Sequence, residues 1–400
     1  MQNPLAALLF LPDSEKKSRG LLNTPREIFQ QPETWLTTLD RLSAIRPSLV
    51  GLLESFVQTD RNGQRPEIIL TGAGTSDYIG RAVSGILRKR LPCDVSTVPS
   101  TELLTSLNDF ILPEKKYLLI SFSRSGESSE GVAVLEQTLE HYPQQVRHLL
   151  VTCNENGNMA KFPGVFPLVL DSKVNDRGLA MTSSFSNMVI AGQYLAFAKA
   201  PERFEPLVRK LAEIGSQKMS EAAETTARLA TEGFTRVCFL GTGALQAVAE
   251  ESALKVLELN SGKIATVAQS ALGLRHGPLS FVNDETLVVA YLSGDEQRQQ
   301  YELDLLEEMQ KKHLGAEALI VAPYATSRID RITKNVLSLD APKDFPDFCL
   351  PAVDIIAGQL LGLFFSIKNG ITPDSPSAGA ISRVVSHVKI YSPAGGKLQR

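Results

Sequence analysis

The segment Val237–Leu279, VCFLGTGALQAVAEESALKVLELNSGKIATVAQSALGLRHGPL, predicts a strand, a glycine turn, a long helix and a tight turn in succession. An apolar run ends at Leu240 and is followed by GTG at 241–243, which is typical of a buried strand that leads into a turn. The next sixteen residues, 244–259, are rich in strong helix formers and lack Gly and Pro, so they are expected to form a helix. This stretch therefore predicts one unit of an α/β sheet.

Three charged side chains on this helix, Glu251, Lys255 and Glu258, are spaced at i, i+4 and i+7, so they project from one face. On an arbitrary helix such charges are most often surface decoration. Just downstream, RHGP at 275–278 predicts a rigid turn that presents His276 close behind the helix. A lone histidine is usually structural or solvated, but a histidine beside a carboxylate and an ammonium favours acid–base chemistry. We therefore take Lys255, Glu258 and His276 as candidate catalytic residues.

From residue 67 onward, short apolar runs alternate with helical segments. Strands are expected at 67–70, 117–121, 148–152 and 165–170, with helices at 79–90 and 129–141. After a charged helix at 206–228 the same order recurs, with strands at 237–240, 263–267, 286–292, 318–321 and 335–339. Near-continuous apolar strands separated by helices predict parallel sheets covered on both faces, and right-handed crossovers make such sheets doubly wound. The layout predicts an α/β fold with two similar units in one chain.

Four regions follow from this pattern. They are a helical N-terminal segment at 1–46, a first α/β domain at 47–204, a second at 205–368 and a C-terminal tail at 369–400. The second domain is expected to end in a strongly apolar helix at 351–369. The tail begins with turn residues and contains a strand-like stretch, VVSHVKIY, at 384–391.

Composition and charge exclude several classes of function. The chain has 400 residues, 43% hydrophobic and 21% charged, with a net charge of −3, so it has no basic field for nucleic acid or anionic lipid. Its four cysteines are scattered without a CxxC pair, which favours reduced thiols in a cytoplasmic protein. The apolar stretch at 5–11 is far too short to span a membrane and lacks the basic start of a signal peptide. The five histidines show no HxxxH spacing, so no metal site is expected.

Two loops of the first half carry hydroxyl side chains where a strand ends and a helix begins. They are TGAGTS at 71–76 and SFSRSGESS at 121–129. Glycines let the backbone approach an anion, free amides at a helix start point at it, and Arg124 adds positive charge. We favour a phosphomonoester site here, with Gly74, Thr75, Ser76, Ser123, Arg124, Ser125 and Ser128 as candidate binding residues.

Other interpretations of these loops are weaker. The full GxGxxG of a dinucleotide fold is absent, and no Walker lysine follows either loop, which disfavours ATP. A structural turn with an N-cap would explain one serine-rich loop but not two. The matching loop of the second half reads LSGD at 292–295 and places an acid where an anion would sit. The first half is therefore expected to hold the phosphate and the second to supply the acid–base residues. Ser183, in TSS at 182–184, is a candidate for sugar hydroxyls, and an N-cap explains it equally well.

The motifs GAGTS, SFSRSGESSE, ESALKVLEL and RHGP together resemble the sugar isomerase (SIS) domain family. The two halves resemble the isomerase half of glucosamine-6-phosphate synthase. Almost the whole chain, including TPREIFQQP, MTSSF and SRVV, is similar to the AgaS family of galactosamine-6-phosphate deaminase/isomerases, long labelled tagatose-6-phosphate ketose/aldose isomerases. This resemblance implies two tandem doubly wound SIS domains.

The resemblance also implies roles for individual residues. The hydroxyls and Arg124, which stands where the synthase has glutamine, would surround the sugar phosphate; the residues concerned are Ser76, Ser123, Arg124, Ser125 and Ser128. Glu258 would shuttle the proton between carbon atoms, with Lys255 one turn earlier. His276 would open the sugar ring in the site of a neighbouring subunit, so a homodimer with shared sites is implied. Arg383 would take the place of a C-terminal lysine that touches the sugar in the synthase.

The implied activity is conversion of galactosamine 6-phosphate to tagatose 6-phosphate and ammonia in amino-sugar catabolism, with no cofactor and no metal. The glutaminase domain of the synthase is missing, which makes ammonia a product rather than a donor. Two alternatives stay open: an aldose–ketose isomerase that releases no ammonia, and a non-catalytic sugar-phosphate sensor. The sequence also leaves open whether galactosamine or glucosamine 6-phosphate, which differ at C4, is used.

Overall fold

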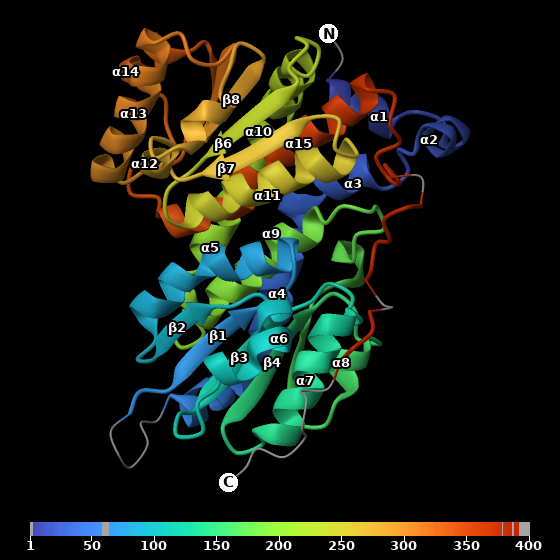
Figure 1. Cartoon of the computed structure of the whole chain (residues 1–400), viewed down its shortest axis with the longest axis vertical. Helices are drawn as coiled ribbons and strands as arrows, with labels where there is room; N and C mark the ends of the chain where they lie inside the picture. Colours follow the sequence, from blue (N-terminus) through green and yellow to red (C-terminus); the bar gives the residue numbers. More distant parts are fainter. Residues whose placement is uncertain (1–2, 58–63, 378, 386–387, 392–400) are drawn as a thin grey trace.

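The computed structural model describes residues 3–57, 64–377, 379–385 and 388–391. Two parallel five-stranded sheets occupy the two halves of an elongated molecule, with helices packed around each sheet (Figure 1). The predicted α/β architecture with a helical N-terminal segment is confirmed. The helices between the two sheets join the halves, because α5 packs directly against α11.

The two sheets have the same strand order. The first is β2-β1-β3-β4-β5 and the second is β10-β9-β8-β6-β7, so each has the order 2-1-3-4-5 when its strands are numbered along the chain. The strands of the first sheet are β1 (Glu67–Thr71), β2 (Asp94–Thr97), β3 (Tyr117–Phe122), β4 (Val146–Thr152) and β5 (Val165–Val169). Those of the second sheet are β6 (Arg236–Leu240), β7 (Ala265–Gln269), β8 (Thr286–Tyr291), β9 (Glu317–Ala322) and β10 (Asn335–Ser338). The order reverses between β1 and β3, and between β6 and β8. Ligands of such sheets bind outside the carboxyl ends of the strands at this reversal.

Helices fill the remainder of both halves. They are α1 (Pro4–Leu9), α2 (Asp13–Arg19), α3 (Thr24–Phe29), α4 (Gln31–Phe56), α5 (Thr75–Arg90), α6 (Ser100–Phe110), α7 (Ser129–His141), α8 (Asn158–Lys161), α9 (Ser183–Leu195), α10 (Glu205–Leu229), α11 (Ala244–Leu259), α12 (Ala271–Leu274), α13 (Glu296–Lys311), α14 (Ser327–Ile332) and α15 (Pro351–Lys368). The helix α4 runs without a break through residues 46 and 47, where the sequence pattern places a boundary. The second half is built as predicted around α11, which packs on α15 and β7.

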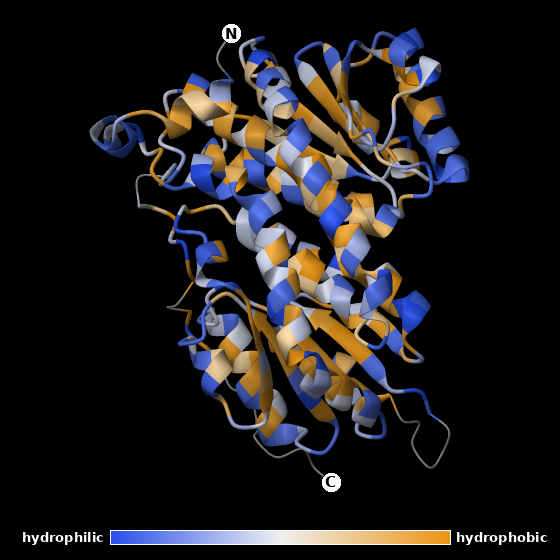
Figure 2. Cartoon of the chain, turned by 180° about the vertical axis from the view of Figure 1, so that it is seen from behind, coloured by the Kyte–Doolittle hydropathy of each residue, from blue (hydrophilic) through white to orange (hydrophobic). Residues whose placement is uncertain are grey.

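The core lies under the strands and around two almost fully buried helices, α9 and α15. All six residues of β8 are buried, which explains its continuous apolar run. Figure 2 shows the apolar strands inside and hydrophilic residues on the outer helices. Among the described residues, α15 alone is long and apolar enough to cross a membrane, but 89% of it is buried inside the protein. Its apolar composition is therefore that of a core helix.

Three features differ from the sequence prediction. The edge strand β2 and the helix α6 are not among the predicted elements. The sequence of β2, DVST at 94–97, is short and half polar and so lacks an apolar run. In the tail, residues 384, 385 and 388–391 form no strand, so the strand-like interpretation of VVSHVKIY is wrong for these residues; 386 and 387 lie outside the described residues. A β-branched run adopts a strand only where a neighbouring strand pairs with it.

Candidate active site

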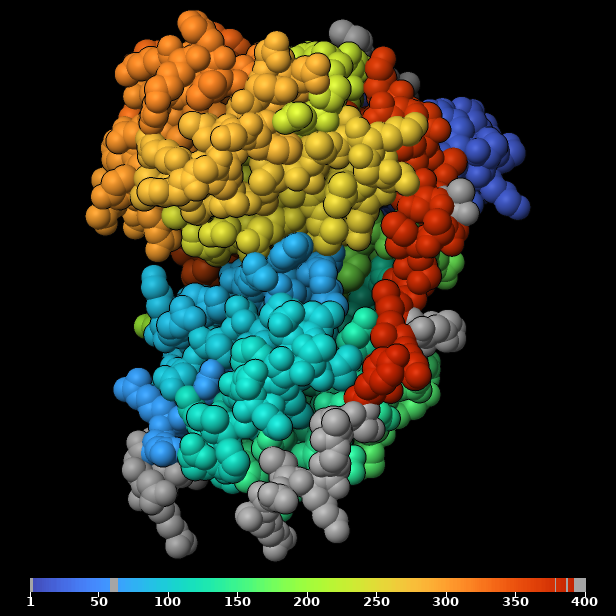
Figure 3. All heavy atoms as spheres, viewed as in Figure 1, coloured from blue at the N-terminus to red at the C-terminus, as the bar shows by residue number. Residues whose placement is uncertain are grey.

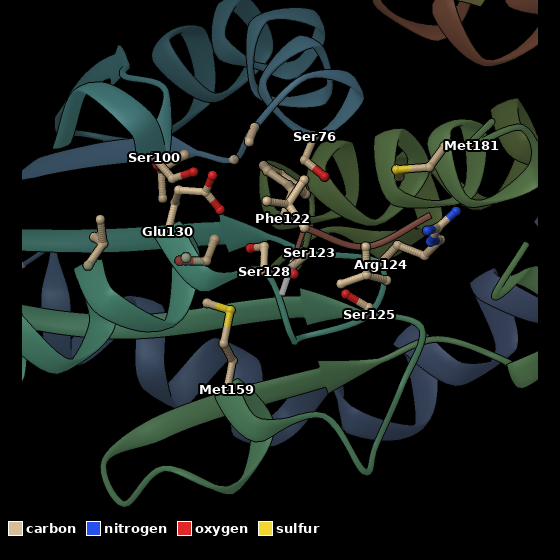
Figure 4. Close-up of a pocket in the computed structure, with 18 of the residues that line it drawn as sticks. Ser76, Ser100, Phe122, Ser123, Arg124, Ser125, Ser128, Glu130, Met159 and Met181 are labelled. Carbon is tan, nitrogen blue, oxygen red and sulfur yellow. The ribbon is translucent and has the colours of Figure 1, made fainter. Parts of the chain in front are cut away.

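A cavity of about 160 Å³ opens at the carboxyl end of β1 and β3, where the strand order of the first sheet reverses. Six of the predicted binding residues line it: Ser76, Ser123, Arg124, Ser125, Ser128 and Arg383. Figure 4 shows hydroxyls from the start of α5 and from the loop after β3 converging on one space. The two serine-rich loops therefore line a single cavity.

Two glycines shape the loops that carry the cavity residues. A side chain at Gly72 would bring its Cβ within 2.5 Å of the Ser76 Cβ, so only glycine lets the loop after β1 fold tightly onto the start of α5. Gly126 has φ +65°, a left-handed conformation that is unfavourable for residues with a Cβ. Both positions explain why glycine stands between the hydroxyl residues.

The loop hydroxyls are oriented by the backbone. The Ser123 Oγ accepts a hydrogen bond from the Gly126 N–H at 3.1 Å, and the Ser125 Oγ accepts one from the Glu127 N–H at 3.2 Å. A hydroxyl that accepts in this way keeps its own hydrogen for donation. The first turn of α7 begins at the same place, and its Ser129 N–H is bound by the Val385 carbonyl of the tail. The loop is thus a set of donors suited to an anion.

Arg124 is the positive charge of the cavity. Its side chain is buried, with 5% exposed, and one of its terminal nitrogens donates to the Arg383 carbonyl at 2.7 Å. Its Nε and its other terminal nitrogen have no hydrogen-bond partner among the described residues. Burial, with a smaller effect of the nearby Arg383, lowers the pKa of Arg124 below its usual range. A buried guanidinium with unsatisfied donors favours an anionic ligand with acceptor oxygens.

The C-terminal tail closes one side of the cavity. It runs down the side of the molecule from the second half to the first (red in Figure 3). The Val385 carbonyl accepts from the Ser129 N–H at 2.9 Å, in the first turn of α7. The Arg383 guanidinium donates to the Asn175 Oδ1 at 2.7 Å. Arg383 therefore contributes charge to the cavity, and the tail backbone binds two of the groups around it.

Several lining residues were not predicted. They are Thr71, Ser100, Ser121, Glu130, Met159 and Met181. The Thr71 hydroxyl and the Glu130 Oε2 are buried without a hydrogen-bond partner among the described residues. Ser100 begins α6, an element that the sequence pattern does not reveal. In Figure 4 Glu130 and Arg124 lie on opposite sides of Ser123, so the cavity has an acidic and a basic side.

The charged residues of α11 form a buried cluster against α5. The Lys255 Nζ lies 2.5 Å from the Glu258 Oε2, 3.4 Å from the Glu251 Oε1 and 3.1 Å from the Thr75 Oγ1. Lys255 and Glu251 are fully buried, whereas the Glu258 side chain is 29% exposed. Surface decoration is thereby excluded for this helix face. Glu251 belongs to this cluster although it is not among the candidate catalytic residues, and its i, i+4 spacing to Lys255 is the sequence signal for its position.

Burial and charge set the protonation of this cluster. Burial raises the pKa of Glu251 to about 8, with Lys255 opposing the shift and Glu258 adding to it. Burial disfavours the charged form of Lys255, but the two glutamates outweigh it and raise the pKa of Lys255. At neutral pH the cluster therefore holds a charged Lys255 beside a largely protonated Glu251.

Thr75 and Gly74 do not line the cavity. The Thr75 hydroxyl donates to Glu251 at 3.2 Å and accepts from Lys255, so it belongs to the α11 cluster. Its neighbour Ser76 lines the cavity. Two consecutive residues at the start of α5 thus connect the anion cavity with the acid–base cluster. Gly74 occupies the N-cap position before them, with φ +57°.

Glu258 and His276 are far apart within one chain. The Gln269 carbonyl, at the end of β7, accepts from the Gly241 N–H just before α11, so β7 ends beside the start of α11. The helix α12 and His276 follow β7 directly and therefore lie near the start of α11. Glu258 lies at the other end of α11, about 21 Å further along a helix that rises 1.5 Å per residue. Figure 1 shows α12 at the outer left edge and α11 ending towards the tail. His276 is exposed and does not lie behind the Lys255–Glu258 pair, so the expected proximity is wrong within one chain.

The structure does not bring Ser183 to the cavity. Its hydroxyl donates to the Asp176 Oδ1 at 2.6 Å, and the backbone N–H groups of 182–184 also bind the Asp176 carboxylate. Asp176 thus binds the N–H groups at the start of α9, whereas Thr182, the N-cap residue, makes no side-chain cap hydrogen bond, so the N-cap interpretation of TSS at 182–184 is wrong as well.

At the equivalent edge of the second sheet, an acidic side chain of the protein itself binds the hydrogen-bond donors of the loop after β8. The Asp347 carboxylate accepts from the Gly294 N–H at 2.7 Å and from the Ser293 hydroxyl, and it pairs with Arg298 at 3.2 Å. Asp295, which the sequence pattern places there, instead caps α13. An internal carboxylate therefore takes the place of an external anion in this half. Among the described residues no group of three or more His, Cys, Asp or Glu side chains could hold a metal ion.

Comparisons with known proteins identify the family of the chain. Residues 233–363 match the SIS domain family model. The chain is 36% identical over 385 residues to the D-galactosamine-6-phosphate deaminase AgaS of Escherichia coli, covering 92% of this chain and 95% of that protein. The crystal structure of tagatose-6-phosphate ketose/aldose isomerase from Escherichia coli superposes with a TM-score of 0.83 and 33% identity, covering 92% of this chain and 96% of that one. A crystal structure from Clostridium novyi has a TM-score of 0.91 and 30% identity, with 96% and 99% covered.

Proposed function

The chain belongs to the AgaS family of D-galactosamine-6-phosphate deaminases, and on that premise we propose that it converts galactosamine 6-phosphate and water to tagatose 6-phosphate and ammonia. One observation carries the proposal: Ser76 lines an anion cavity while the adjacent Thr75 binds the Lys255 of the acid–base cluster. Neither Lys255 nor Glu258 lines the cavity, so the proposal requires the sugar of a phosphate-bound substrate to extend past Ser76 to Glu258, the partly exposed member of the cluster.

The anion cavity binds the phosphate of the substrate. Hydroxyls of Ser76, Ser123, Ser125 and Ser128 donate to its oxygens, and Arg124 supplies charge-assisted hydrogen bonds from its two free nitrogens. Arg383 adds a second positive charge from the tail. The remote phosphate fixes the position of the reacting carbons, which lowers the entropic cost of the proton transfers.

Glu258 is the base that moves the proton. As a carboxylate it removes the C2 proton of the open-chain amino sugar and returns a proton at C1, which leaves an imine at C2. Lys255, held 2.5 Å from Glu258, stabilises the negative charge that develops on the sugar oxygen. The buried Glu251, largely protonated, leaves Lys255 available to Glu258. Water then hydrolyses the imine to the ketose and ammonia.

His276 completes the site of a partner subunit in this proposal. It is exposed and lies at the end of α11 opposite Glu258, so a single chain does not supply both groups to one substrate. A homodimer with shared sites would supply them together, with His276 opening the sugar ring. We further propose that the domains divide near residue 204 and that the enzyme acts in the cytoplasm, in amino-sugar catabolism.

The test is ammonia release from purified protein. We expect ammonia and ketose 6-phosphate in equal amounts from galactosamine 6-phosphate, less from glucosamine 6-phosphate, and none from the N-acetylated forms, since an amide nitrogen is not released as ammonia. A second candidate, an aldose–ketose isomerase without deamination, is favoured by the name of the Escherichia coli structure. It predicts interconversion of neutral hexose 6-phosphates with no ammonia from either amino sugar, and that result would contradict the main proposal.

A further inference from the structure

The N-terminal helix α3 is capped by a residue from the other end of the chain. The Asp374 Oδ1 accepts from the Thr24 N–H and from the Thr24 hydroxyl, both at 2.8 Å. Its Oδ2 accepts from the Asn23 N–H at 3.0 Å and from the Asn23 side-chain amide at 3.3 Å. A single carboxylate thus binds four donors some 350 residues away in sequence. TPREIFQQP, which the sequence comparison singled out, begins at this contact.

The backbone of Asp374 extends the contact to a third segment. Its N–H donates to the Gly20 carbonyl at 2.9 Å, and its carbonyl accepts from the Leu179 N–H at 3.2 Å. Leu179 ends the loop of residues 175–179, which we call the 175–179 loop. Asp374 therefore ties the tail both to the N-terminal helices and to this loop.

The same helix α3 holds the 175–179 loop from its other side. The Glu27 carboxylate accepts from the Arg177 N–H at 2.5 Å and from the Gly178 N–H at 3.3 Å. A Cβ on Gly178 would lie 2.8 Å from the Thr24 Oγ1, so the loop packs against α3 without space for a side chain. Helix α3, the loop and Asp374 form one interlocked unit.

This unit determines where the tail meets the cavity. The first residue of the loop, Asn175, accepts from the Arg383 guanidinium, nine residues beyond Asp374. The tail then reaches Arg124 through the Arg383 carbonyl and the first turn of α7 through the Val385 carbonyl. The position of the Arg383 charge therefore depends on the anchor at Asp374.

We propose that Asp374 is a positioning residue for the anion site, acting through Arg383 and the tail wall that covers Arg124. It makes no contact with the cavity itself. With the anchor removed, the tail loses its fixed path, water reaches the Arg124 guanidinium, and the hydrogen bonds of this side chain to phosphate weaken as the local dielectric rises. This inference deepens the proposed function and rests on it for the identity of the substrate.

The experiment compares Asp374→Ala, Asp374→Asn and Asp295→Ala in the full chain. Asp295 is a matched control, because it also caps a helix with its carboxylate but lies on α13, away from the tail. Three quantities are measured: the Kd for inorganic phosphate, KM and kcat for galactosamine 6-phosphate, and hydrogen exchange of the 379–385 amides and of the Ser129 N–H. The phosphate Kd and the hydrogen exchange need no turnover. They therefore test the role of Asp374 even if the protein releases no ammonia.

For Asp374→Ala we expect a phosphate Kd and a KM raised about tenfold, a smaller change in kcat, and faster exchange at Ser129, since charge-assisted hydrogen bonds are lost. Asp374→Asn, which keeps an acceptor oxygen for Thr24, should lie between this variant and the wild type, and Asp295→Ala should match the wild type in all three. If the alanine variant does not fold, Thr24→Val removes one donor and should still raise the phosphate Kd about threefold. Unchanged phosphate binding and tail exchange in folded Asp374 variants would overturn the proposal. Tighter phosphate binding in these variants would also overturn it, because the tail would then compete with phosphate for Arg124.

Discussion

The Lys255 ammonium and the Glu258 carboxylate form an ion pair of 2.5 Å, one turn apart on α11, in which Lys255 is fully buried and Glu258 is partly open to solvent. The exposed part of the Glu258 carboxylate leaves it accessible to a ligand.

Glu258→Gln should abolish turnover without weakening phosphate binding. The amide keeps the shape of the side chain but cannot accept the C2 proton, so we expect a loss of kcat of about 10²–10⁴-fold. Ammonia release gives kcat, and calorimetry with inorganic phosphate gives the affinity. Glu250→Gln, on the same helix and paired with Arg81, is the control and should retain activity. Wild-type turnover in Glu258→Gln would remove Glu258 from the mechanism.

Mixing two inactive variants should restore activity if His276 serves the partner's site. In a dimer of Glu258→Gln and His276→Ala chains, one of the two shared sites contains both native residues, so an equal mixture should regain about one quarter of wild-type activity. The mixture is exchanged under mild denaturant and assayed for ammonia. Each variant treated alone is the control. A mixture as inactive as its components would place Glu258 and His276 in the same chain.

Gly72→Ala should disrupt the anion cavity. The new Cβ would meet the Ser76 Cβ at 2.5 Å, so the start of α5 must shift, and we expect destabilisation of about 1–3 kcal/mol with weaker phosphate binding. Gly85→Ala is a matched control, because the position lies in the interior of α5 with nothing within 4 Å of an added Cβ. That substitution should stabilise the protein by about 0.5–1 kcal/mol, since alanine favours helix. Urea unfolding and phosphate titration measure both, and equal effects of the two substitutions would contradict the assigned geometry.

Glu251→Gln should flatten the dependence of stability on pH between pH 4.5 and about pH 8. The folded state raises the pKa of Glu251 from 4.5 to about 8, so Glu251 favours folding when protonated. Its contribution is fully present below pH 4.5 and is lost as pH rises to about 8. The wild type should therefore lose up to about 1.4 kcal/mol per pH unit more than the variant over this range. Glu27, whose pKa burial also raises to about 8, is unchanged in both proteins and cancels in the comparison. Parallel stability curves would show that Glu251 is ionised in the fold.

Sequence reasoning was most successful where chemistry and position coincide in a short motif. The hydroxyls of Ser76 and Ser123 lie about 50 residues apart, but both follow strands of a parallel sheet, whose carboxyl ends share one edge. The position of Lys255 could be predicted equally well from the sequence, because one face of α11 must pack against the rest of the protein.

Contacts between distant segments could not be predicted in this way. The separation of His276 from Glu258 depends on β7 running back along α11, which reverses what closeness in sequence suggests. Thr75 and Ser76 are neighbours with different partners because successive helical residues point about 100° apart. Ser183 satisfies Asp176, and neither residue type reveals that pairing in advance. Asp374 at the N-terminus of α3 is likewise visible only in three dimensions.

Asp347 makes the crevice of the second sheet different from that of the first. Both sheets reverse their strand order at equivalent places, but in the second the donors of Ser293 and Gly294 are already neutralised from within. The crevice of the second half therefore does not offer these two donors to an external anion. One aspartate of the chain itself acts there as a permanent ligand.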